Sequence, residues 1–354
     1  MTQRVVFTDK HQSTDIDWTA APKPQRPVLD INDLWVEFPV FGGRVQALNG
    51  VNLQVHAGEV VGLVGESGSG KSVTAMLAMR LLHEAQYQVK KGAIQLTEHD
   101  VFSCTEKQMQ VLRGSEVAMI FQEPMTALNP TMRIGQQMID VVLYHEKGTQ
   151  RRQARVRVIE LLKAMYIADA EQVFEAYPFE LSGGMRQRIM VAMAFSCAPQ
   201  LLIADEPTTA LDVTVQKQVL NLLKEQAQRM QTALLIITHD MAVVSQYCER
   251  IYVMYAGTVV ESGPTTQVIQ RPAHPYTKGL LSGIPTPQTR GQNLSTIPGQ
   301  PPNLQHLPAG CAFQERCSKA FSACIQRPSM YPVGPDQVAA CWLYESSHVH
   351  EERP

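Results

Sequence analysis

The stretch GESGSGKS, residues Gly65–Ser72, decides the fold that we predict for this chain. It fits the pattern G-x-x-x-x-G-K-[ST], follows the apolar run EVVGLVG, and opens the helically spaced segment KSVTAMLAMRLL. Glycines let the backbone fold tightly, so that several N–H groups and the helix N-terminus can cradle phosphate oxygens. A Gly-rich turn before an ordinary helix is the alternative, but all eight positions and both flanks agree with a phosphate loop.

The side chains of this loop have distinct expected roles. Lys71 is expected to reach the β- and γ-phosphates, and the Ser72 hydroxyl to contact Mg²⁺. The expected ATP-binding set is Gly65, Glu66, Ser67, Gly68, Ser69, Gly70, Lys71, Ser72 and Val73.

A second apolar run, LLIADEP from Leu201, predicts a buried strand with two carboxylates at its end. Open α/β sheets bind ligands at the carboxyl edge of their strands. Asp205 is suited to Mg²⁺, directly or through water, and Glu206 to polarising the water that attacks the γ-phosphate. A solvated turn is the alternative for Asp-Glu alone, but the pairing with the phosphate loop favours ATP hydrolysis. His239 ends another apolar run, IITHD, and by itself indicates only a hydrogen-bonded structural residue.

Composition excludes several other classes of protein. The 354 residues carry a formal net charge of -2 with no dense Lys/Arg block, which does not suggest a nucleic-acid partner. No apolar run reaches the roughly 18 residues that span a bilayer, and the N-terminus lacks the apolar core of a signal peptide. We therefore expect a cytoplasmic location, where thiols stay reduced.

The pattern along the chain predicts three regions. Residues 1–27 are expected to be a flexible extension, and residues 28–264 an α/β domain with a helical subdomain at about 130–177. Proline and glycine become frequent after Pro264, which predicts a largely irregular C-terminal extension over residues 265–354. We expect this extension to be separate from the domain that holds the phosphate site. In the helical subdomain we expect one apolar face, made of Val156, Ile159, Leu162 and Met165.

The segment LSGGMRQR at Leu181 resembles the signature sequence of ABC-transporter ATPase subunits. With the phosphate loop, Gln122 in MIFQEPM, LLIADEPTTALD and His239, it completes the ordered motif set of that family over about residues 28–270. The resemblance implies an α/β fold: a P-loop NTPase of the ABC cassette type, with a mixed-sheet core and a helical subdomain. It also implies ATP and Mg²⁺ as ligands.

The same resemblance implies a head-to-tail dimer with ATP between the phosphate loop of one subunit and the signature of the other. Asp212 would lie in a loop that contacts the partner, and Phe41, with Phe38 as the alternative, would stack on adenine. The implied catalytic residues are Glu206, His239 and Gln122, the implied Mg²⁺ ligands are Ser72, Gln122 and Asp205, and the signature residues serving the partner's ATP are Ser182, Gly183 and Gly184.

Four cysteines lie in the extension, at Cys311, Cys317, Cys324 and Cys341. Their gaps of five, six and sixteen residues favour buried free thiols, then an iron–sulfur cluster, then zinc, which usually has tighter pairs. The segments HPYTKGLL, GQPPNL and GCAFQERC, however, are similar to the C-terminal extension of the oligopeptide/dipeptide/nickel importer subfamily. That resemblance implies that these cysteines bind a [4Fe–4S] cluster. The cluster would cross-link an extension that is poor in apolar residues and so stabilise it.

The function implied is that of an ATP-binding and ATP-hydrolysing subunit of an importer, peripheral on the cytoplasmic face of the inner membrane. Its implied partners are two transmembrane permeases, a second homologous ATPase in a heterodimer and, indirectly, an extracytoplasmic solute-binding protein; no nucleic acid is implied. The cargo stays open among dipeptides, longer peptides, nickel chelates and opine-like compounds. The alternative is a soluble ABC ATPase acting on ribosomes or DNA, which the single cassette and the C-terminal cysteines disfavour.

Overall fold

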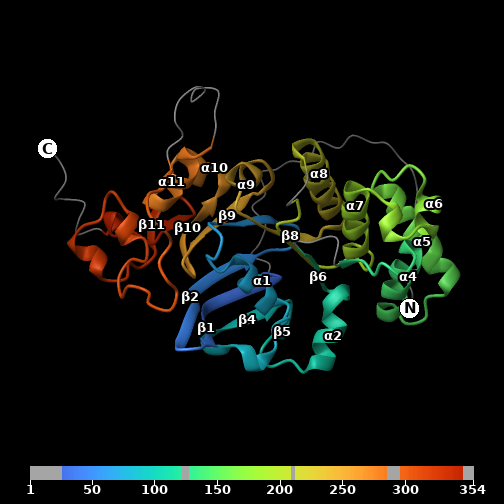
Figure 1. Cartoon of the computed structure of the whole chain (residues 1–354), viewed down its shortest axis with the longest axis horizontal. Helices are drawn as coiled ribbons and strands as arrows, with labels where there is room; N and C mark the ends of the chain where they lie inside the picture. Colours follow the sequence, from blue (N-terminus) through green and yellow to red (C-terminus); the bar gives the residue numbers. More distant parts are fainter. Residues whose placement is uncertain (1–25, 122–126, 209–211, 285–295, 346–354) are drawn as a thin grey trace.

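The computed structural model describes residues 26–121, 127–208, 212–284 and 296–345. The expected N-terminal extension therefore lies almost wholly outside the described residues. In the described part, a helical region and the C-terminal region stand at opposite ends of a central sheet (Figure 1). None of the described helices is both long and apolar enough to cross a bilayer.

The central sheet has eight strands in the order β11-β12-β10-β9-β3-β8-β7-β6. The five strands from β9 to β6 run parallel, and β10, β12 and β11 add antiparallel pairs, so the sheet is mixed as expected. Their bounds are β3 Val60–Val64, β6 Val117–Ile120, β7 Leu201–Asp205, β8 Ala233–Thr238, β9 Arg250–Tyr255, β10 Thr258–Pro264, β11 Tyr331–Gly334 and β12 Gln337–Ala339.

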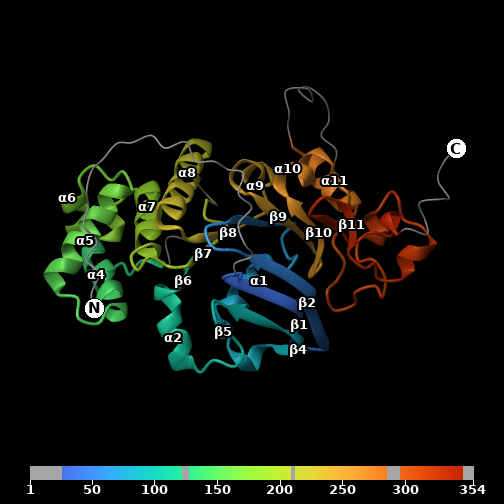
Figure 2. The ribbon, with the colours of Figure 1, turned by 180° about the vertical axis from the view of Figure 1, so that it is seen from behind.

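A second, antiparallel sheet covers one face of the first (Figure 2). Its order is β2-β1-β4-β5. The alternate side chains of β3 explain why that strand is apolar throughout: Val61 and Leu63 pack toward this sheet, whereas Val60 and Val64 pack toward helices. The bounds are β1 Leu29–Val40, β2 Gly43–Val55, β4 Gln88–Leu96 and β5 His99–Asp100.

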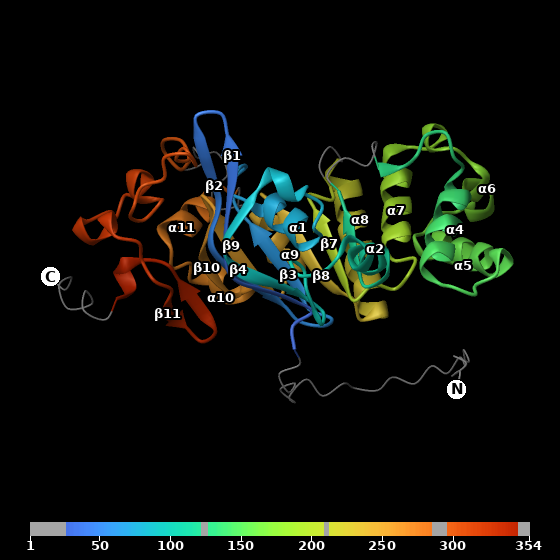
Figure 3. The same ribbon diagram turned by 90° about the horizontal axis from the view of Figure 1, so that it is seen from below.

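Helices cover the rest of the central sheet, and four of them stand together at the end opposite the C-terminal region (Figure 3). These four are α4 Ile134–His145, α5 Arg151–Ala164, α6 Ala170–Glu175 and α7 Gly183–Ala194. The others are α1 Lys71–Ala78, α2 Glu106–Ser115, α8 Val213–Met230, α9 Met241–Tyr247, α10 Thr265–Gln270 and α11 Pro275–Ser282. Short 3-10 turns are η1 Glu84–Gln86, η2 Pro178–Glu180, η4 Gln314–Arg316, η5 Ser322–Ile325 and η6 Trp342–Tyr344.

The predicted apolar face of α5 is buried at Leu162 and Met165, but the prediction is wrong at Val156. Val156 is 53% exposed, whereas Ala154 and Val158 are fully buried. The prediction took a strict three-residue spacing from Val156, but the buried positions alternate between spacings of three and four, as a helix of 3.6 residues per turn requires.

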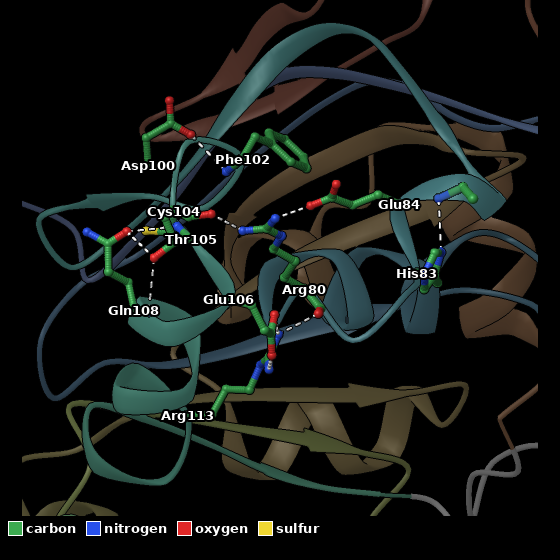
Figure 4. Close-up of polar contacts among 11 residues, drawn as sticks. Arg80, His83, Glu84, Asp100, Phe102, Cys104, Thr105, Glu106, Gln108 and Arg113 are labelled. Carbon is green, nitrogen blue, oxygen red and sulfur yellow. Dashed lines mark hydrogen bonds and ion pairs between the residues drawn. The ribbon is translucent and has the colours of Figure 1, made fainter.

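Helix α1 is shorter than its apolar pattern predicted, because Arg80 leaves the helical conformation with φ 47. Its guanidinium donates to the carbonyl of Cys104 and pairs with Glu84 (Figure 4). Arg113 of α2 then donates to the carbonyl oxygen of Arg80 at 2.6 Å and pairs with Glu106 at 2.6 Å. Arg113 also donates to the carbonyl oxygen of Met79 at 2.8 Å, so one arginine satisfies the two carbonyls that directly follow α1.

The C-terminal region is joined to the core, which corrects the expectation of a largely irregular and separate extension. Strand β12 pairs with β10, with Glu261 opposite Ala339. The carboxylate of Glu261 is fully buried and accepts hydrogen bonds from the backbone N–H groups of Ala273 and His274 and from Gln337, each at 2.8 Å. A buried carboxylate needs several donors, and here Glu261 lies before the predicted boundary at 264/265 whereas its three donors lie after it.

Apolar packing also holds this region, contrary to the expectation that it lacks core-forming residues. Phe313, only 3% exposed, lies 5.2 Å from the ring of Tyr255 and 5.4 Å from that of Tyr276. Tyr255 belongs to β9 and Tyr276 to α11, so the aromatic group spans the core and the extension.

We predict that His274 makes stability depend on acidity. Its ring is buried and accepts from the N–H of Tyr276 at 3.0 Å, and burial lowers its pKa from 6.5 to about 3. The folded state therefore favours the neutral ring. The contribution of this neutral ring to the free energy of unfolding is fully present above about pH 6.5. It is lost at up to about 1.4 kcal/mol per pH unit as the pH falls toward 3.

His274→Asn keeps an acceptor for Tyr276 but removes this proton-binding group. Urea unfolding of the two proteins between about pH 7 and 5 should therefore give a smaller loss of stability for the variant. His99→Asn, in β5, is the matched control. Parallel stability curves for the wild type and His274→Asn would exclude this role.

Candidate active site

The phosphate loop runs from the end of β3 to the start of α1 and is packed too tightly for side chains at two glycines. A Cβ on Gly65 would lie 2.1 Å from the carbonyl oxygen of Met254. Gly70, the N-cap of α1, has φ 105, and a Cβ there would lie 2.9 Å from the carbonyl oxygen of Ala47. Glycine is therefore required at both ends of the loop, which fixes where its N–H groups point.

Lys71 is folded back into its own loop. Its Nζ donates to the carbonyl oxygens of Gly65 at 2.8 Å and Glu66 at 2.9 Å, and the residue is only 5% exposed. Burial lowers the pKa of Lys71, while Glu206 and Asp205 oppose that shift. An anion that enters the loop would bring a negative charge close to the ammonium of Lys71 and so favour its charged form.

Ser72 and Asp205 lie side by side at the edge of the sheet, as the sequence predicted. The Ser72 hydroxyl donates to Oδ1 of Asp205 at 3.1 Å. Burial raises the pKa of Asp205, whereas the Ser72 bond and Lys71 lower it. Two hard oxygen ligands beside a phosphate loop fit Mg²⁺, which binds one or two protein oxygens together with substrate phosphates. When bound, the ion would neutralise charge on the phosphate oxygens.

Glu206 and His239 come together from the ends of adjacent strands β7 and β8. Oε1 of Glu206 lies 3.0 Å from Nδ1 of His239. The backbone of Glu206 is left-handed, with φ 45, and its N–H donates to the carbonyl of Ile237 at 2.8 Å. This conformation costs on the order of 1 kcal/mol for a residue with a Cβ, and it turns the carboxylate toward the cavity above the phosphate loop.

A cavity of about 400 Å³ opens above the loop and is lined by Glu206, Lys71 and Ser72. Phe38 forms part of its wall, whereas Phe41 stands at the β1–β2 turn and is fully exposed. For the aromatic residue that stacks on adenine, this arrangement favours Phe38, the alternative considered above, over Phe41. The sequence pattern missed three wall residues, Val45 and Ala47 of β2 and Leu304 of the C-terminal region.

The signature residues do not line this cavity. Ser182 is the N-cap of α7, and its Oγ accepts from the N–H of Met185 at 3.3 Å. Ser182 and Gly183 are exposed, and a Cβ at Gly183 would meet nothing within 4 Å. Another residue of α7, Gln187, is fully buried and donates to the carbonyl oxygen of Pro207, directly after Glu206. Sequence reasoning missed this link between the signature helix and the catalytic edge.

Of two other expected residues, Asp212 and Gln122, the structure describes only Asp212. Asp212 caps α8, where its Oδ1 accepts from the N–H groups of Thr214 and Val215 at 3.0 Å. Its expected role toward a partner subunit stays a prediction. Gln122 lies outside the described residues.

The phosphate loop is also held by the C-terminal region, which corrects the expectation that the two are independent. Arg316 forms a two-pronged ion pair with Glu66, at 2.8 and 3.1 Å. The hydroxyl of Tyr276 accepts from the N–H of Glu66 at 2.9 Å. Neither contact follows a sequence motif, since the partners are 250 and 210 residues apart.

The four cysteines of the extension surround one small cavity of about 10 Å³. Burial raises the pKa of Cys311 to about 11 and also raises the pKa of Cys317 and Cys341, so the structure favours protonated thiols. Among the described residues, no group of three or more His, Cys, Asp or Glu side chains is arranged to hold a metal ion. The gathering of the thiols fits the prediction, but the structure does not support the expected [4Fe–4S] cluster.

Comparison with known proteins agrees with the fold. Residues 48–209 match the ABC transporter family, and residues 260–324 match the oligopeptide/dipeptide transporter C-terminal region. The chain is 59% identical to the probable D,D-dipeptide transport ATP-binding protein DdpD of Escherichia coli K12, over 90% of this chain and 97% of that protein. It is 44% identical to the oligopeptide transport ATP-binding protein OppD of Salmonella typhimurium, over 92% and 96% of the two chains.

A solved structure shares the fold: the ATP-binding cassette MJ0796, a dimer in a post-hydrolysis state with ADP and Pi, has a TM-score of 0.60 at 24% identity. The match covers 67% of this chain and 98% of that one. The chain therefore belongs to the ABC transporter family of ATPases, within the group of ATP-binding proteins that carry the oligopeptide/dipeptide transporter C-terminal region.

The role of Glu206 as the acceptor of a hydrogen bond from the attacking water stays a prediction, and in the structure its carboxylate contacts His239 at 3.0 Å. We predict that Glu206→Gln retains ATP binding but lowers the rate of phosphate release by about 100-fold or more, because the amide is a far weaker base. Glu98→Gln, at an exposed position between β4 and β5, is the matched control. Hydrolysis at the normal rate in the Glu206 variant would refute the assignment.

Proposed function

We propose that this chain is the ATP-hydrolysing subunit of a peptide importer and that it docks on the cytoplasmic face of the inner membrane. The observation that carries the proposal is the presence, on one chain, of a match to the ABC transporter family and of a C-terminal region matching that of oligopeptide/dipeptide transporters. The proposed assembly contains two permease subunits, a second homologous ATPase and an extracytoplasmic solute-binding protein. Short peptides, including dipeptides, are the proposed cargo class, following the names of the relatives.

In the proposed mechanism, a pair of cassettes closes on two ATP molecules and reopens after hydrolysis. The position of the signature supports this arrangement, because Ser182 and Gly183 present hydroxyl and N–H groups to solvent, away from the cavity of their own chain. Such donors suit the γ-phosphate oxygens of ATP bound to a partner subunit. Closure on ATP would then move the helical region, which we propose transmits the motion to the permeases together with Gln122.

We predict that Ser182→Arg separates binding from turnover. Isolated subunits should bind ATP nearly normally, because residue 182 lies outside their own ATP cavity. Vesicles that contain the variant with both permeases, the second ATPase and the binding protein should show neither ATPase stimulation nor uptake of a labelled dipeptide. A matched variant on the exposed face of α5, Val156→Arg, should retain ATP hydrolysis by the cassette pair.

Two results would count against this proposal. Loss of ATP affinity in the isolated Ser182→Arg subunit would contradict a signature that acts on the partner's ATP. Wild-type vesicles that hydrolyse ATP without taking up any di- or oligopeptide would overturn the peptide cargo while leaving the ATPase assignment intact.

We also propose that the four extension cysteines hold a [4Fe–4S] cluster. Support comes from the chemistry of the donor set, because Cys311, Cys317, Cys324 and Cys341 line a single cavity. The cavity is far smaller than a cubane, so the surrounding turns would have to move apart around it. When bound, the cluster would supply cross-links between η4, η5 and η6.

Protein purified without oxygen should then carry about four iron and four sulfide per chain, with broad brown absorbance. Cys317→Ser should lower both contents and speed proteolysis after Gly299, whereas Cys197→Ser, away from the cavity, should change neither. Zinc without iron or sulfide would replace the cluster by a structural zinc site. Metal-free protein with an equally protease-resistant extension would return these cysteines to buried thiols.

A further inference from the structure

The phosphate loop contains an acidic residue at a place where a polyanion must bind. Glu66 follows Gly65 directly, and the carbonyl oxygens of both residues hold Lys71. An uncompensated carboxylate here would repel the triphosphate through the same low-dielectric surroundings that make Lys71 effective. The structure compensates it with Arg316, whose side chain is only 6% exposed.

Arg316 is itself held firmly by the C-terminal region. Its Nε donates to the carbonyl oxygen of Pro298 at 2.8 Å, and Nη1 donates to the hydroxyl of Tyr255 at 3.2 Å as well as to Glu66 at 2.8 Å. Two parallel N–H···O bonds fix both the direction and the distance of the carboxylate, which a single lysine contact would not do. Glu66 is further fixed by Tyr276 through its backbone N–H.

The same stretch of chain reaches the other end of the cavity. The N–H of Gln46, in β2, donates to the carbonyl oxygen of Leu304 at 2.9 Å, and the Leu304 side chain lines the cavity beside Phe38. Residues 297–316 thus contact the site at the phosphate loop and at the wall next to the expected adenine position. This segment spans the site rather than lying next to it.

We propose that Arg316 is a positioning residue for ATP binding: by neutralising and orienting Glu66, it makes the C-terminal segment 297–316 a working part of the phosphate site. The role is in binding rather than in the chemical step, because Arg316 acts on the phosphate loop through Glu66. It concerns ATP alone and so does not depend on which cargo is carried.

The position of Arg316 also connects this role to the thiol-lined cavity. Arg316 ends η4, and both Cys311 before it and Cys317 directly after it line that cavity. The backbone N–H of Arg316 donates to the carbonyl oxygen of Phe313 at 3.0 Å, so the turn is short and stiff. A change that spreads these thiols would therefore shift the guanidinium that holds Glu66.

The test is a charge-compensation experiment on ATP affinity, measured by titrating Mg-ATP into the purified full-length chain. Arg316→Met should weaken binding by about tenfold, the effect expected for losing a charge-assisted hydrogen-bonded pair. Adding Glu66→Gln to that variant should restore affinity to within about threefold of the wild type, because the repulsive charge is then gone as well. Arg316→Lys should give an intermediate value.

The matched control is Arg327→Met, which removes another arginine of the same region. Arg327 stacks on Trp35 at 4.5 Å and donates to the carbonyl of Asn49, away from the phosphate loop. This variant should keep wild-type ATP affinity even if its thermal unfolding midpoint falls. In turnover assays, Arg316→Met should raise KM for ATP with kcat nearly unchanged.

Three results would overturn the proposal. One is wild-type or tighter ATP binding by Arg316→Met. Another is an equal loss of affinity in Arg327→Met, which would indicate a general structural effect. The third is failure of Glu66→Gln to rescue. Should Arg316→Met not fold, Arg316→Lys supplies the same comparison, with a partial loss that Glu66→Gln must reduce.

Discussion

Backbone N–H groups hold a triphosphate only if the chain that carries them is fixed at both ends, and this constraint organises the molecule. The β3 strand is fully buried between β8 and β9, so the start of the loop cannot move. At the other end, Gly70 is wedged against Ala47 and Met254 from two different strands. The two sheets and the first helix therefore meet at the phosphate loop, and a change in the packing of any of them would alter the geometry of that loop.

The catalytic edge depends on the same sheet. Asp205 and Glu206 leave β7, and His239 follows β8, so parallel pairing places three side chains from distant positions together. Gln187 extends this rigid edge to the signature helix through Pro207. A partner subunit that pulls on α7 would thereby act on the turn that carries Glu206.

The phosphate loop and the carboxylates at the end of β7 could be predicted from the sequence, because each is formed by consecutive residues. Gly65–Ser72 must form its loop from its own glycines, and LLIADEP must end in carboxylates at a sheet edge. Three features could not be predicted. Arg316 reaches Glu66 across 250 residues, β12 and β11 extend the sheet from beyond the proline-rich segment, and Phe38 lines the cavity whereas Phe41 lies in the exposed turn after β1. Each depends on how distant segments pack, and no local pattern encodes that packing.

The long separation between Glu66 and Arg316 has a consequence for how the protein is made. At roughly 5–20 residues per second, a ribosome needs about 12 to 50 seconds to add the 250 residues between them. Strands β8 and β9, which flank β3, are made late in that interval, and from then on the phosphate loop still lacks the partner of its carboxylate and the wall that Leu304 provides. By the role proposed for Arg316, the unfinished cassette should bind ATP more weakly than the finished chain. Full nucleotide binding should then arrive only when the segment that carries Leu304 and Arg316 has been synthesised and has folded back across the site.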